Sequence, residues 1–501
     1  MARDATQDMP DLLVVGGGVN GAGLARDAAG RGLAVLLVEQ DDLAAHTSSS
    51  STKLIHGGLR YLEHCEFRLV REALLERERL LAIAPHVIAP LRFVLPHDVR
   101  VRPAWLVRTG LFLYDHLASR KRLPASTRID LSRDPRGAPL NPLTRVGFEY
   151  SDCSADDARL VVLNALDARE RGADIRVGVR LESARREGGV WAATLRGPSG
   201  ETQAARARIL VNAAGPWVSD VLDRRLGLGG FKRVRLVRGG HIVTPRLYEG
   251  AHAYVLQNPD RRVVFAIPYQ DDFTLVGTTE VPHDAPCACA RVSADEVEYL
   301  VATINRWFRK GISAEHVAWS FSGVRALFDD GAVDASAVTR DYVLDLDAPP
   351  GGAPLLSAFG GKLTTYRRLA EHALQKLSPF LPGLKPAWTA QAALPGGDLP
   401  CGDVAAYARR LFAEKPFLGE ARASRFARSY GTRAERLLAG ITSEAGLGRD
   451  FGAGLTEAET TYLARVEWAR SGEDVLWRRS KLGLRAPACA KARIDAFLKT
   501  I

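Results

Sequence analysis

The chain has 501 residues, of which 46% are hydrophobic and 25% are charged, a composition that indicates a globular protein of two or three domains and excludes a disordered one. Its formal net charge of +10 favours an acidic partner, a class that includes nucleic acids, anionic lipids and phosphorylated substrates. Six dispersed cysteines, of which only Cys287 and Cys289 are close together, indicate free thiols in a reducing compartment and no metal site.

The chain begins without the apolar segment of a signal peptide, because its first apolar run spans only residues 12–15. No later stretch approaches the length of about 20 uncharged apolar residues that would span a bilayer. We therefore expect a cytoplasmic protein that meets a membrane, if at all, from its surface.

The first 40 residues predict a strand, a tight turn, a helix and a second strand. Residues 12–15 are apolar and end in glycines, residues 20–30 are rich in small side chains, and residues 34–38 form the next apolar run. This is the order in which a dinucleotide-binding unit begins.

The turn carries Gly16, Gly18 and Gly21 in a G-x-G-x-x-G pattern. Glycines at these positions let the backbone approach a pyrophosphate, whose charge lies against the positive end of the helix. Glu39 closes the second strand, where a carboxylate accepts ribose hydroxyl groups and disfavours a 2′-phosphate. The segment therefore predicts bound NAD or FAD.

A hydroxyl-rich segment, TSSSSTKLIHGGLRY, follows at residues 47–61. Its hydroxyl groups and glycines suit an extended cofactor lying along the protein, and the apolar Leu54 and Ile55 argue against a flexible linker. The segment therefore favours FAD over NAD. Residues 66–83 then predict an amphipathic helix that ends before Pro85.

Basic side chains flank an apolar, aromatic stretch that contains Trp105, Leu106 and Phe112. The cations are Arg100, Arg102, Arg108, Arg120, Lys121, Arg122 and Arg128. Two interpretations fit this pattern, namely a core helix with a solvated basic rim and a surface that lies on anionic lipid.

The middle of the chain repeats the alternation of helix and strand. A helix near residues 159–171 and short strands at 175–179, 190–195 and 207–213 predict a second pass through the same sheet. Four strand-like runs separated by turn residues then predict an antiparallel sheet, at residues 234–237, 241–243, 263–267 and 273–277.

Residues 395–400, PGGDLP, are predicted to be a linker because prolines and glycines interrupt any regular element. Beyond them the pattern is helical to the end, and Thr456 and Glu459 fit a capping box. We expect a separate helical domain there.

Further motifs follow one another along the chain, at residues 151–153 (SDC), 157–160 (DARL), 212–217 (NAAGPW), 277–279 (GTT), 322–325 (SGVR), 339–342 (TRDY) and 359–366 (FGGKLTTY). Together with the hydroxyl-rich segment they resemble the bacterial FAD-dependent, respiratory glycerol-3-phosphate dehydrogenases. The match runs from residue 11 to near the C-terminus, and it is far more specific than the dinucleotide turn alone.

The resemblance implies an α/β fold with a Rossmann-like FAD-binding domain of the glycine/D-amino-acid oxidase type, an antiparallel β substrate domain and a helical C-terminal domain. The FAD-binding domain is expected to be discontinuous, at residues 10–80, 150–232 and 330–390. The substrate and membrane-facing domain is expected at residues 81–149 and 233–329, and the helical domain at 398–501.

The resemblance also implies oxidation of sn-glycerol 3-phosphate to dihydroxyacetone phosphate, by hydride transfer from C2 to flavin N5, with electrons passed to a membrane quinone. Because a quinone is lipid-soluble, the resemblance favours the membrane interpretation of the basic, aromatic stretch. It implies a peripheral protein on the cytoplasmic face of the inner membrane. The sequence leaves the oligomeric state open, with a homodimer as one option.

Residue roles are implied only at positions within the matching segments. A phosphate dianion calls for guanidinium groups, and an alkoxide that develops at C2 calls for a base and a cation. The implied catalytic residues are His241, Arg325 and Lys362, and the implied substrate-binding residues are Arg60, Tyr61, Thr278 and Arg340. The implied FAD contacts are Gly16, Gly18, Asn20, Gly21, Glu39, Thr47, Ser48, Ser51, Lys53, Leu54, His56, Gly57, Gly58, Gly215, Trp217, Gly361, Lys362, Leu363 and Thr364.

Three other activities remain as alternatives. Two are enzymes, an oxygen-using glycerol-3-phosphate oxidase and an FAD-dependent 2-hydroxy-acid oxidoreductase. The third is a flavoprotein that binds nucleic acid, but the chain has no recognisable nucleic-acid motif, so no such partner is expected. His46 precedes the hydroxyl-rich segment, where some related flavoproteins carry a covalent link, and we expect noncovalent FAD.

Overall fold

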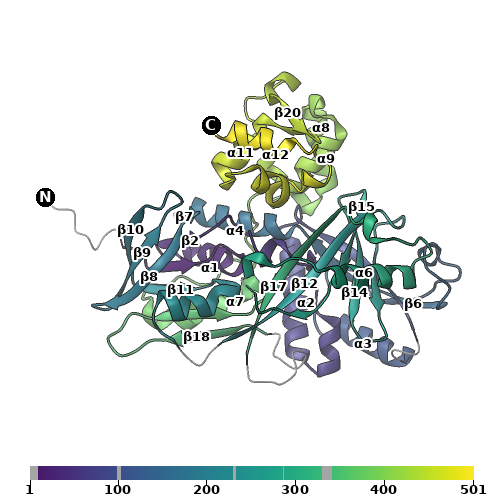
Figure 1. Ribbon diagram of the computed structural model, residues 1–501, viewed down its shortest axis with the longest axis horizontal. Coiled ribbons are helices and arrows are strands. Elements are labelled where there is room, and N and C mark those ends of the chain that lie inside the picture. Colours follow the sequence, from purple (N-terminus) through teal and green to yellow (C-terminus); the bar gives the residue numbers. More distant parts are fainter. Residues whose placement is uncertain (1–8, 99–102, 230–232, 286, 330–340) are drawn as a thin grey trace.

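The computed structural model describes residues 9–98, 103–229, 233–285, 287–329 and 341–501. Figure 1 shows two lobes that contain sheets, side by side, and a helical domain that stands above them and carries the C-terminus. Within the described part of the chain, no helix combines the length and the apolar character needed to cross a bilayer.

The first lobe is built on a six-stranded sheet that is parallel except for one edge strand. Its strands, in spatial order, are β18 (Val343–Asp347), β19 (Leu355–Phe359), β11 (Ile209–Asn212), β1 (Leu12–Val15), β2 (Val35–Glu39) and β7 (Asp174–Val177). The predicted strand, turn, helix and strand at the start of the chain are therefore present.

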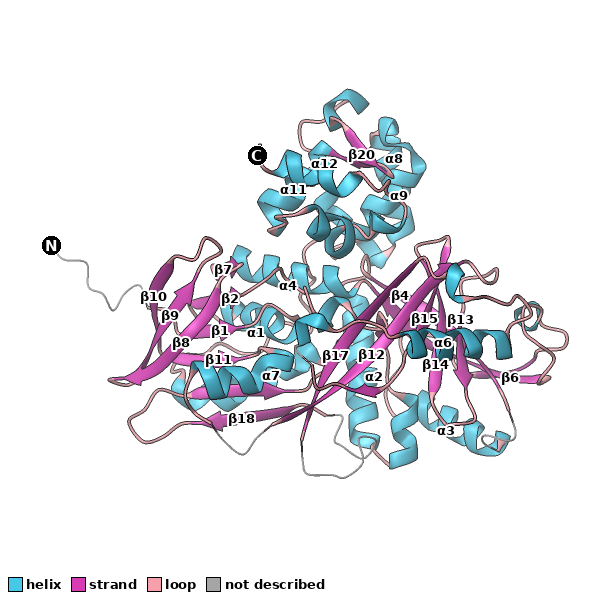
Figure 2. Ribbon diagram, viewed as in Figure 1, coloured by secondary structure: helices cyan, strands magenta, loops and turns pink. Residues whose placement is uncertain are grey.

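Both faces of this sheet are covered, which explains why its strands are apolar at every position. Leu12 and Val14 pack against helices, namely α1 (Val19–Gly30), α4 (Asp157–Glu170) and α7 (Tyr366–Leu377). Leu13 and Val15 pack on the other side against three antiparallel strands, β8 (Arg180–Glu187), β9 (Val190–Arg196) and β10 (Thr202–Ala207). Figure 2 shows the helices and the small sheet on either side of β1 and β2.

The second lobe is built on a ten-stranded sheet that is antiparallel apart from the pairing of β13 with β4. Its strands are β3 (Leu54–Ile55), β4 (Ile88–Pro96), β5 (Thr127–Asp130), β6 (Val146–Ala155), β12 (Val234–Pro245), β13 (Ala253–Gln257), β14 (Val263–Tyr269), β15 (Phe273–Gly277), β16 (Val281–Pro282) and β17 (Trp319–Phe328).

Helices cover parts of this sheet on both faces. Side chains of α2 (Phe67–Ile83) and α3 (Ala104–His116) share one core cluster with Leu91 and Phe93 of β4. Side chains of α6 (Ala294–Trp307) share the opposite cluster with Val94 and Ile242. The amphipathic helix predicted at residues 66–83 is therefore α2, and it starts one residue later.

One predicted boundary in this lobe is wrong. We expected a turn between the runs at residues 234–237 and 241–243, because Gly239 and Gly240 lie between them. Strand β12 instead continues through both glycines and pairs with β17 along its length, Gly239 opposite Gly323 and Gly240 opposite Ser322. Glycine fits a strand where another group approaches closely, and here a Cβ atom on Gly239 would lie 2.7 Å from Thr278 Oγ1.

The helical domain has its own apolar core, which includes Leu411, Phe426, Tyr430 and Leu463. It contains α8 (Val404–Glu414), α9 (Gly419–Tyr430), α10 (Ala434–Leu437), α11 (Glu457–Glu467), α12 (Ala490–Leu498) and a hairpin of β20 (Asp450–Gly452) and β21 (Leu455–Thr456). A π-helix at Asp474–Arg479 lies between α11 and α12.

Only half of the predicted capping box at α11 is present. The Thr456 hydroxyl accepts a hydrogen bond from the Glu459 amide at 3.4 Å. The Glu459 carboxylate does not return to the cap and instead accepts bonds from Arg425 Nη2 at 2.7 Å and from Tyr430 Oη at 2.7 Å. A buried carboxylate gains more from a charged guanidinium than from a backbone amide.

Candidate functional site

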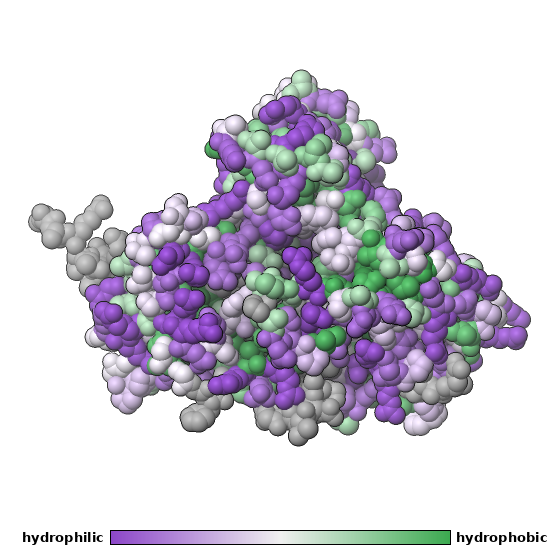
Figure 3. Space-filling view, viewed as in Figure 1, coloured by the Kyte–Doolittle hydropathy of each residue, from purple (hydrophilic) through white to green (hydrophobic). Residues whose placement is uncertain are grey.

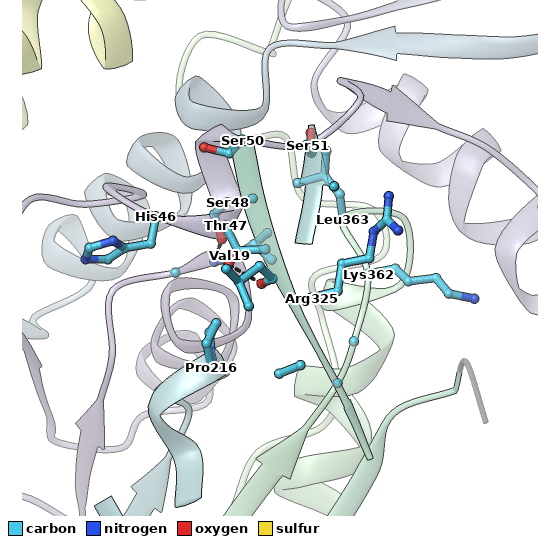
Figure 4. A pocket seen from close by; sticks show the side chains of 18 of the residues that line it. Val19, His46, Thr47, Ser48, Ser50, Ser51, Pro216, Arg325, Lys362 and Leu363 are labelled. Atoms are coloured by element: carbon cyan, nitrogen blue, oxygen red, sulfur yellow. Dashed lines mark hydrogen bonds between the residues drawn. The ribbon is translucent and has the colours of Figure 1, made fainter. Parts of the chain in front are cut away.

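A cavity of about 570 Å³ lies between the two sheets, a size within the range of small-molecule sites. One end is formed by the carboxyl ends of β1, β2 and β11, the place where open parallel sheets bind ligands. The other end is lined by alternate residues of the ten-stranded sheet, including Phe93, Val255 and Phe265. Figure 4 shows Val19, Thr47 and Ser48 together, with Arg325 and Lys362 to one side of them.

The glycine turn brings the start of α1 to this cavity. Gly16 has a φ of +111°, which an L side chain rarely adopts, and a Cβ atom on Gly21 would lie 1.9 Å from the Gly16 carbonyl oxygen. The turn can therefore close only with glycine at both positions. The positive dipole end of α1 then lies at the cavity and suits a pyrophosphate.

Glu39 lies at the cavity wall where β2 ends. Its carboxylate accepts hydrogen bonds from the Gly17 amide at 2.6 Å and the Asp41 amide at 2.9 Å. Burial raises the pKa of this carboxyl group, and the two amide bonds oppose that rise. The group is held in place at the position where a ribose hydroxyl would reach it.

The hydroxyl-rich segment also lines the cavity, and several of its side chains are anchored individually. Ser48 Oγ accepts a hydrogen bond from the Val19 amide at 3.0 Å, and Thr47 Oγ1 donates to the Val324 carbonyl at 2.6 Å. Ser51 Oγ donates to Asp157 Oδ2 at 2.8 Å. The segment is therefore an ordered wall, as its apolar residues predicted.

The loop after β19 forms a third wall. Asn20 Nδ2 donates to the Gly360 carbonyl at 3.0 Å, and Gly361 has a φ of +96°. Thr364 Oγ1 accepts a bond from the His56 amide at 3.2 Å. These contacts join the loop to α1 and to the hydroxyl-rich segment, so three distant parts of the chain meet around one ligand space.

Two cations line the cavity beside β17 and the loop after β19. Arg325 comes from β17, with Nη2 3.3 Å from Thr278 Oγ1 and Nη1 3.3 Å from Glu280 Oε1. Lys362 Nζ is buried and lies 4.1 Å from the centre of the Tyr61 ring, without a hydrogen-bond partner among the described residues. A buried ammonium group without a partner suits an anionic ligand.

Both histidines beside these cations favour the uncharged form. Burial, followed by the charges of Arg325 and Lys53, lowers the pKa of His241 to about 3. Burial also lowers the pKa of His56, with Asp152 opposing the shift and Lys362 and Arg325 adding to it. His241 Nε2 lies 2.9 Å from Thr52 Oγ1, and its ring stacks on Phe321 with centroids 4.9 Å apart. Neither histidine therefore adds positive charge to that of Arg325 and Lys362.

Most of the implied site residues line the cavity. These are Gly16, Gly18, Asn20, Glu39, Thr47, Ser48, Ser51, Leu54, His56, Gly58, Arg60, Tyr61, Gly215, Trp217, His241, Thr278, Arg325, Gly361, Lys362, Leu363 and Thr364. Gly21, Lys53 and Gly57 do not line it. Gly21 lies beneath the turn, the Lys53 ammonium group binds Asp157 behind the wall, and the Gly57 amide donates to Tyr114 Oη at 2.8 Å. Arg340, Arg100 and Arg102 lie outside the described residues.

Sequence reasoning assigned no role to Asp152, Thr52, Gln257 and Glu280, which also line the cavity. Asp152 accepts hydrogen bonds from Arg77 Nη1 at 2.6 Å and from Tyr114 Oη at 2.7 Å, beside His56. Its place in the SDC motif was a usable signal. Gln257 has no such signal, because only the pairing of β13 with β14 turns its side chain toward the cavity.

His46 lies at the edge of the cavity, on the side away from Arg325 and Lys362 in Figure 4. Its Nε2 atom lies 2.8 Å from Asp41 Oδ2, and its ring contacts that of Trp217 with centroids 4.5 Å apart. The imidazole is therefore already held by two neighbours.

Two family models cover most of the chain. Residues 11–367 match the model of the FAD dependent oxidoreductases, and residues 387–500 match the C-terminal domain of alpha-glycerophosphate oxidase. The solved structure of a glycerol-3-phosphate dehydrogenase from Bacillus halodurans complexed with FAD has the same fold, with a TM-score of 0.73 at 24% identity over 99% of this chain and 94% of that one. The predicted fold class is confirmed, and so is FAD as the cofactor.

Curated relatives match over nearly the full length. The chain is 54% identical to a glycerol-3-phosphate dehydrogenase of Pseudomonas aeruginosa, covering 98% of this chain and 95% of the relative. It is 52% identical to a D-erythritol 1-phosphate dehydrogenase of Brucella abortus, covering 94% of each. The chain therefore belongs to the FAD-dependent oxidoreductases, within the bacterial glycerol-3-phosphate dehydrogenase family.

Proposed function

We propose that this protein is an FAD-dependent dehydrogenase that oxidises sn-glycerol 3-phosphate to dihydroxyacetone phosphate and passes the electrons to a membrane quinone. One observation carries the proposal. The cavity joins a dinucleotide cradle, at Gly16 and Glu39, to two cations, Arg325 and the buried ammonium group of Lys362, that suit a small phosphorylated alcohol.

Bound FAD supplies the hydride acceptor, its N5 atom, for the hydrogen on C2 of the substrate. We assign Arg60, Tyr61, Thr278 and Arg340 to holding the substrate through its phosphate and hydroxyl groups. His241, uncharged at neutral pH, accepts a hydrogen bond or proton from the C2 hydroxyl group. Arg325 and Lys362 stabilise the negative charge that develops on that oxygen.

Two other substrates or acceptors are each favoured by one observation. The 52% identity with a D-erythritol 1-phosphate dehydrogenase favours a four-carbon polyol phosphate. The match to the C-terminal domain of alpha-glycerophosphate oxidase favours oxygen as the acceptor. The four-carbon substrate would keep the phosphate and a secondary alcohol. Oxygen as the acceptor would keep the same oxidation of the substrate by the flavin.

Anaerobic reduction of the flavin tests the proposal directly. When sn-glycerol 3-phosphate is added to the purified holoenzyme without oxygen, the flavin absorbance near 450 nm should bleach and dihydroxyacetone phosphate should form in equal amount. D-erythritol 1-phosphate should bleach it at least about tenfold more slowly at equal concentration, a discrimination typical of one extra carbon group. No bleaching by the first compound would defeat the proposal, and faster bleaching by the second would change the substrate.

We further propose that helix α3 rests on the membrane at the cytoplasmic face. Trp105 is 68% exposed and Phe112 is 59% exposed, whereas Val107 and Leu111 of the same helix are buried against the sheet. Arg108, Lys121 and Arg122 are exposed close by along the chain. An apolar face with cations beside it is what a peripheral protein presents to anionic lipid.

The remaining expectations stay predictions. The pairing of β18 and β19 in the six-stranded sheet supports placing residues 343–359 in the FAD-binding domain. Strand β3 and residues 150–155 of β6, which we expected in that domain, pair instead in the ten-stranded sheet. Noncovalent attachment of FAD would be seen as release of the flavin on acid precipitation. A homodimer would be seen as a doubled mass in light scattering.

A further inference from the structure

The helical C-terminal domain contacts the FAD-binding lobe through buried charges next to the cavity wall. Lys481 follows the π-helix Asp474–Arg479, and its side chain is 4% exposed. Its Nζ atom lies 3.2 Å from Asp156 Oδ1 and 3.4 Å from Asp157 Oδ1, at the start of α4. Lys481 thus reaches out of its own domain into the first lobe.

Asp157 is fully buried and is shared between the hydroxyl-rich segment and the C-terminal domain. Lys53 Nζ donates to its carboxylate at 2.9 and 3.0 Å, and Ser51 Oγ donates to it at 2.8 Å. Burial alone would raise the pKa of Asp157, but the two lysines outweigh it and lower the pKa to about 2. Burial also lowers the pKa of Lys53 to about 8, against the attraction of Asp157. The charges depend on one another.

The residues tied to Asp157 form the cavity wall. Ser51 lines the cavity, and Lys53 Nζ also donates to the Ser49 carbonyl at 2.8 Å, so the two anchors hold the segment from behind. Thr52 lies between them and contacts His241 Nε2. Lys53 and Lys481 both have a φ of +59°, a conformation that lysine rarely adopts, so both backbones are held by their surroundings.

The same C-terminal segment also holds the ribose end of the site. Arg479, whose side chain is fully buried, donates from Nη1 and Nη2 to the two oxygens of Asp42 at 2.8 and 2.7 Å. Arg478 Nε donates to Asp42 at 2.6 Å. Asp42 lies three residues after Glu39, in the loop that leaves β2. Residues 478–481 therefore contact the supports of both walls.

We propose that the C-terminal domain completes the FAD site, with Lys481 as a positioning residue. By balancing the charge of Asp157, Lys481 keeps Ser51 and Lys53 anchored and so holds the hydroxyl-rich wall, with Thr52, in the position that binds FAD. This inference concerns FAD, which the family takes as its cofactor, and does not depend on the substrate proposed above.

A purely structural interface would behave differently, and the chain offers a matched control. Arg433 of the same domain, 8% exposed, forms an ion pair with Glu170 at the far end of α4. Helix α4 runs from Asp157 to Glu170 and is about 20 Å long at 1.5 Å per residue. Breaking the Arg433 pair therefore weakens domain docking at a distance from the cavity wall.

The experiment compares FAD affinity in three variants of the full chain, Lys481→Met, Lys481→Arg and Arg433→Met. Apoprotein is titrated with FAD, and binding is followed by quenching of flavin fluorescence, with the thermal midpoint of each apoprotein recorded in parallel. We expect Lys481→Met to raise the dissociation constant of FAD by about tenfold or more, because the buried Asp157 carboxylate loses one of its two cations. Lys481→Arg should restore most of the affinity, and Arg433→Met should leave it within about twofold of the wild type at a comparable loss of thermal midpoint.

Equal losses of FAD affinity in Lys481→Met and Arg433→Met, or unchanged affinity in Lys481→Met, would overturn the proposal. If Lys481→Met does not fold, amide hydrogen exchange of the wild-type chain, measured with and without FAD, tests the proposal instead. Because coupling is reciprocal, FAD should slow amide exchange at residues 480–484 but not at residues 432–438. No change at residues 480–484 would count against the proposal. All of these measurements omit the substrate, so they can fail while the proposed reaction stands.

Discussion

Arg325 is the residue whose position in the site is the most informative about chemistry. It lines the cavity from β17, and its charge adds to burial in lowering the pKa of both His241 and His56. We expect Arg325→Ala to lower the rate of flavin reduction by sn-glycerol 3-phosphate about 10²- to 10³-fold, as the loss of one preorganised donor to a developing oxyanion does. Stopped-flow absorbance measures this rate.

FAD content should not change in Arg325→Ala, because none of the contacts that form the dinucleotide cradle involves this side chain. Arg246→Ala serves as the control, since that arginine lies on the surface and pairs with Glu249 at 3.1 Å. Near-normal flavin reduction in Arg325→Ala would remove Arg325 from the proposed mechanism.

Buried histidines make the stability of this protein depend on pH. Burial, followed by the charge of Arg159, lowers the pKa of His86 to about 3, whereas an unfolded histidine has a pKa of about 6.5. Between these values the unfolded chain binds a proton that the folded chain does not. His86 therefore lowers the free energy of unfolding by about 1.4 kcal/mol per pH unit as the pH falls below 6.5, and has no such effect above it.

The variant His86→Met should remove this contribution. Urea unfolding of both proteins at pH 7.5, 5.5 and 4.5 measures this contribution. Below pH 6.5, the free energy of unfolding of the wild type should fall relative to that of the variant by about 1.4 kcal/mol per pH unit. If the free energies of unfolding of the two proteins changed with pH in parallel, His86 would take up its proton as readily in the folded chain as in the unfolded one, and the prediction would be wrong.

At the scale of elements, α3 presents apolar side chains on two faces. Val107, Leu111 and Tyr114 pack into the core, and Trp105 and Phe112, seven residues apart, share the exposed face. Figure 1 places α3 at the lower edge, on the side away from the C-terminal domain. Figure 3 shows a face with many hydrophilic side chains and one hydrophobic area on the right-hand lobe, below the C-terminal domain. The exposed side of α3 is therefore the part we expect to enter a lipid headgroup layer.

The double variant Trp105→Ala/Phe112→Ala should bind vesicles that contain anionic lipid at least about tenfold more weakly. Burying each of these side chains in an apolar layer is worth on the order of 1.5–3 kcal/mol. Sedimentation with vesicles measures the binding. Leu143→Ala, at a site 45% exposed in a loop, is the control and should bind like the wild type. If the double variant sedimented with vesicles as the wild type does, the membrane contact would lie outside these two side chains.

Elements with contiguous signals were predictable from sequence. The strand at residues 12–15, the helix that follows it and α2 each carry their periodicity within a short window. Strand β12 was predicted as two pieces because Gly239 and Gly240 look like a turn when the partner strand β17, some 80 residues later in the chain, is unknown. Local propensity yields to pairing that lies far away in sequence.

The direction of single side chains was less predictable than the elements that carry them. Lys53 lies in the middle of the hydroxyl-rich segment, so a contact with FAD was expected from its neighbours. Its left-handed backbone turns the ammonium group behind the wall, toward Asp157, where it supports Ser51 instead. No spacing rule in the segment indicates this, because the cause is the buried carboxylate of α4.

At the scale of the whole molecule, the site is assembled from segments that meet only in the folded chain. His241, Arg325 and Lys362 come from β12, β17 and the loop after β19, and the dinucleotide turn comes from the first 21 residues. Periodicity cannot bring these parts together, and only the resemblance to a known family did so. The proposed functions are also separated in the fold, with the glycine turn in one lobe, the ten-stranded sheet in the other and α3 at the outer edge.

That separation predicts how turnover depends on the acceptor. In the double variant Trp105→Ala/Phe112→Ala, flavin reduction by sn-glycerol 3-phosphate should match the wild type, because α3 contributes no residue to the cavity lining. Steady-state turnover with a long-chain quinone dissolved in vesicles should fall in parallel with vesicle binding, whereas turnover with a water-soluble short-chain quinone should not.

Hydrogen peroxide should account for only a small part of the substrate oxidised in air. Peroxide equal to the substrate consumed, with no response to quinone, would identify an oxygen-using oxidase, and a loss of turnover with both quinones would mean that α3 acts on the site rather than on the membrane.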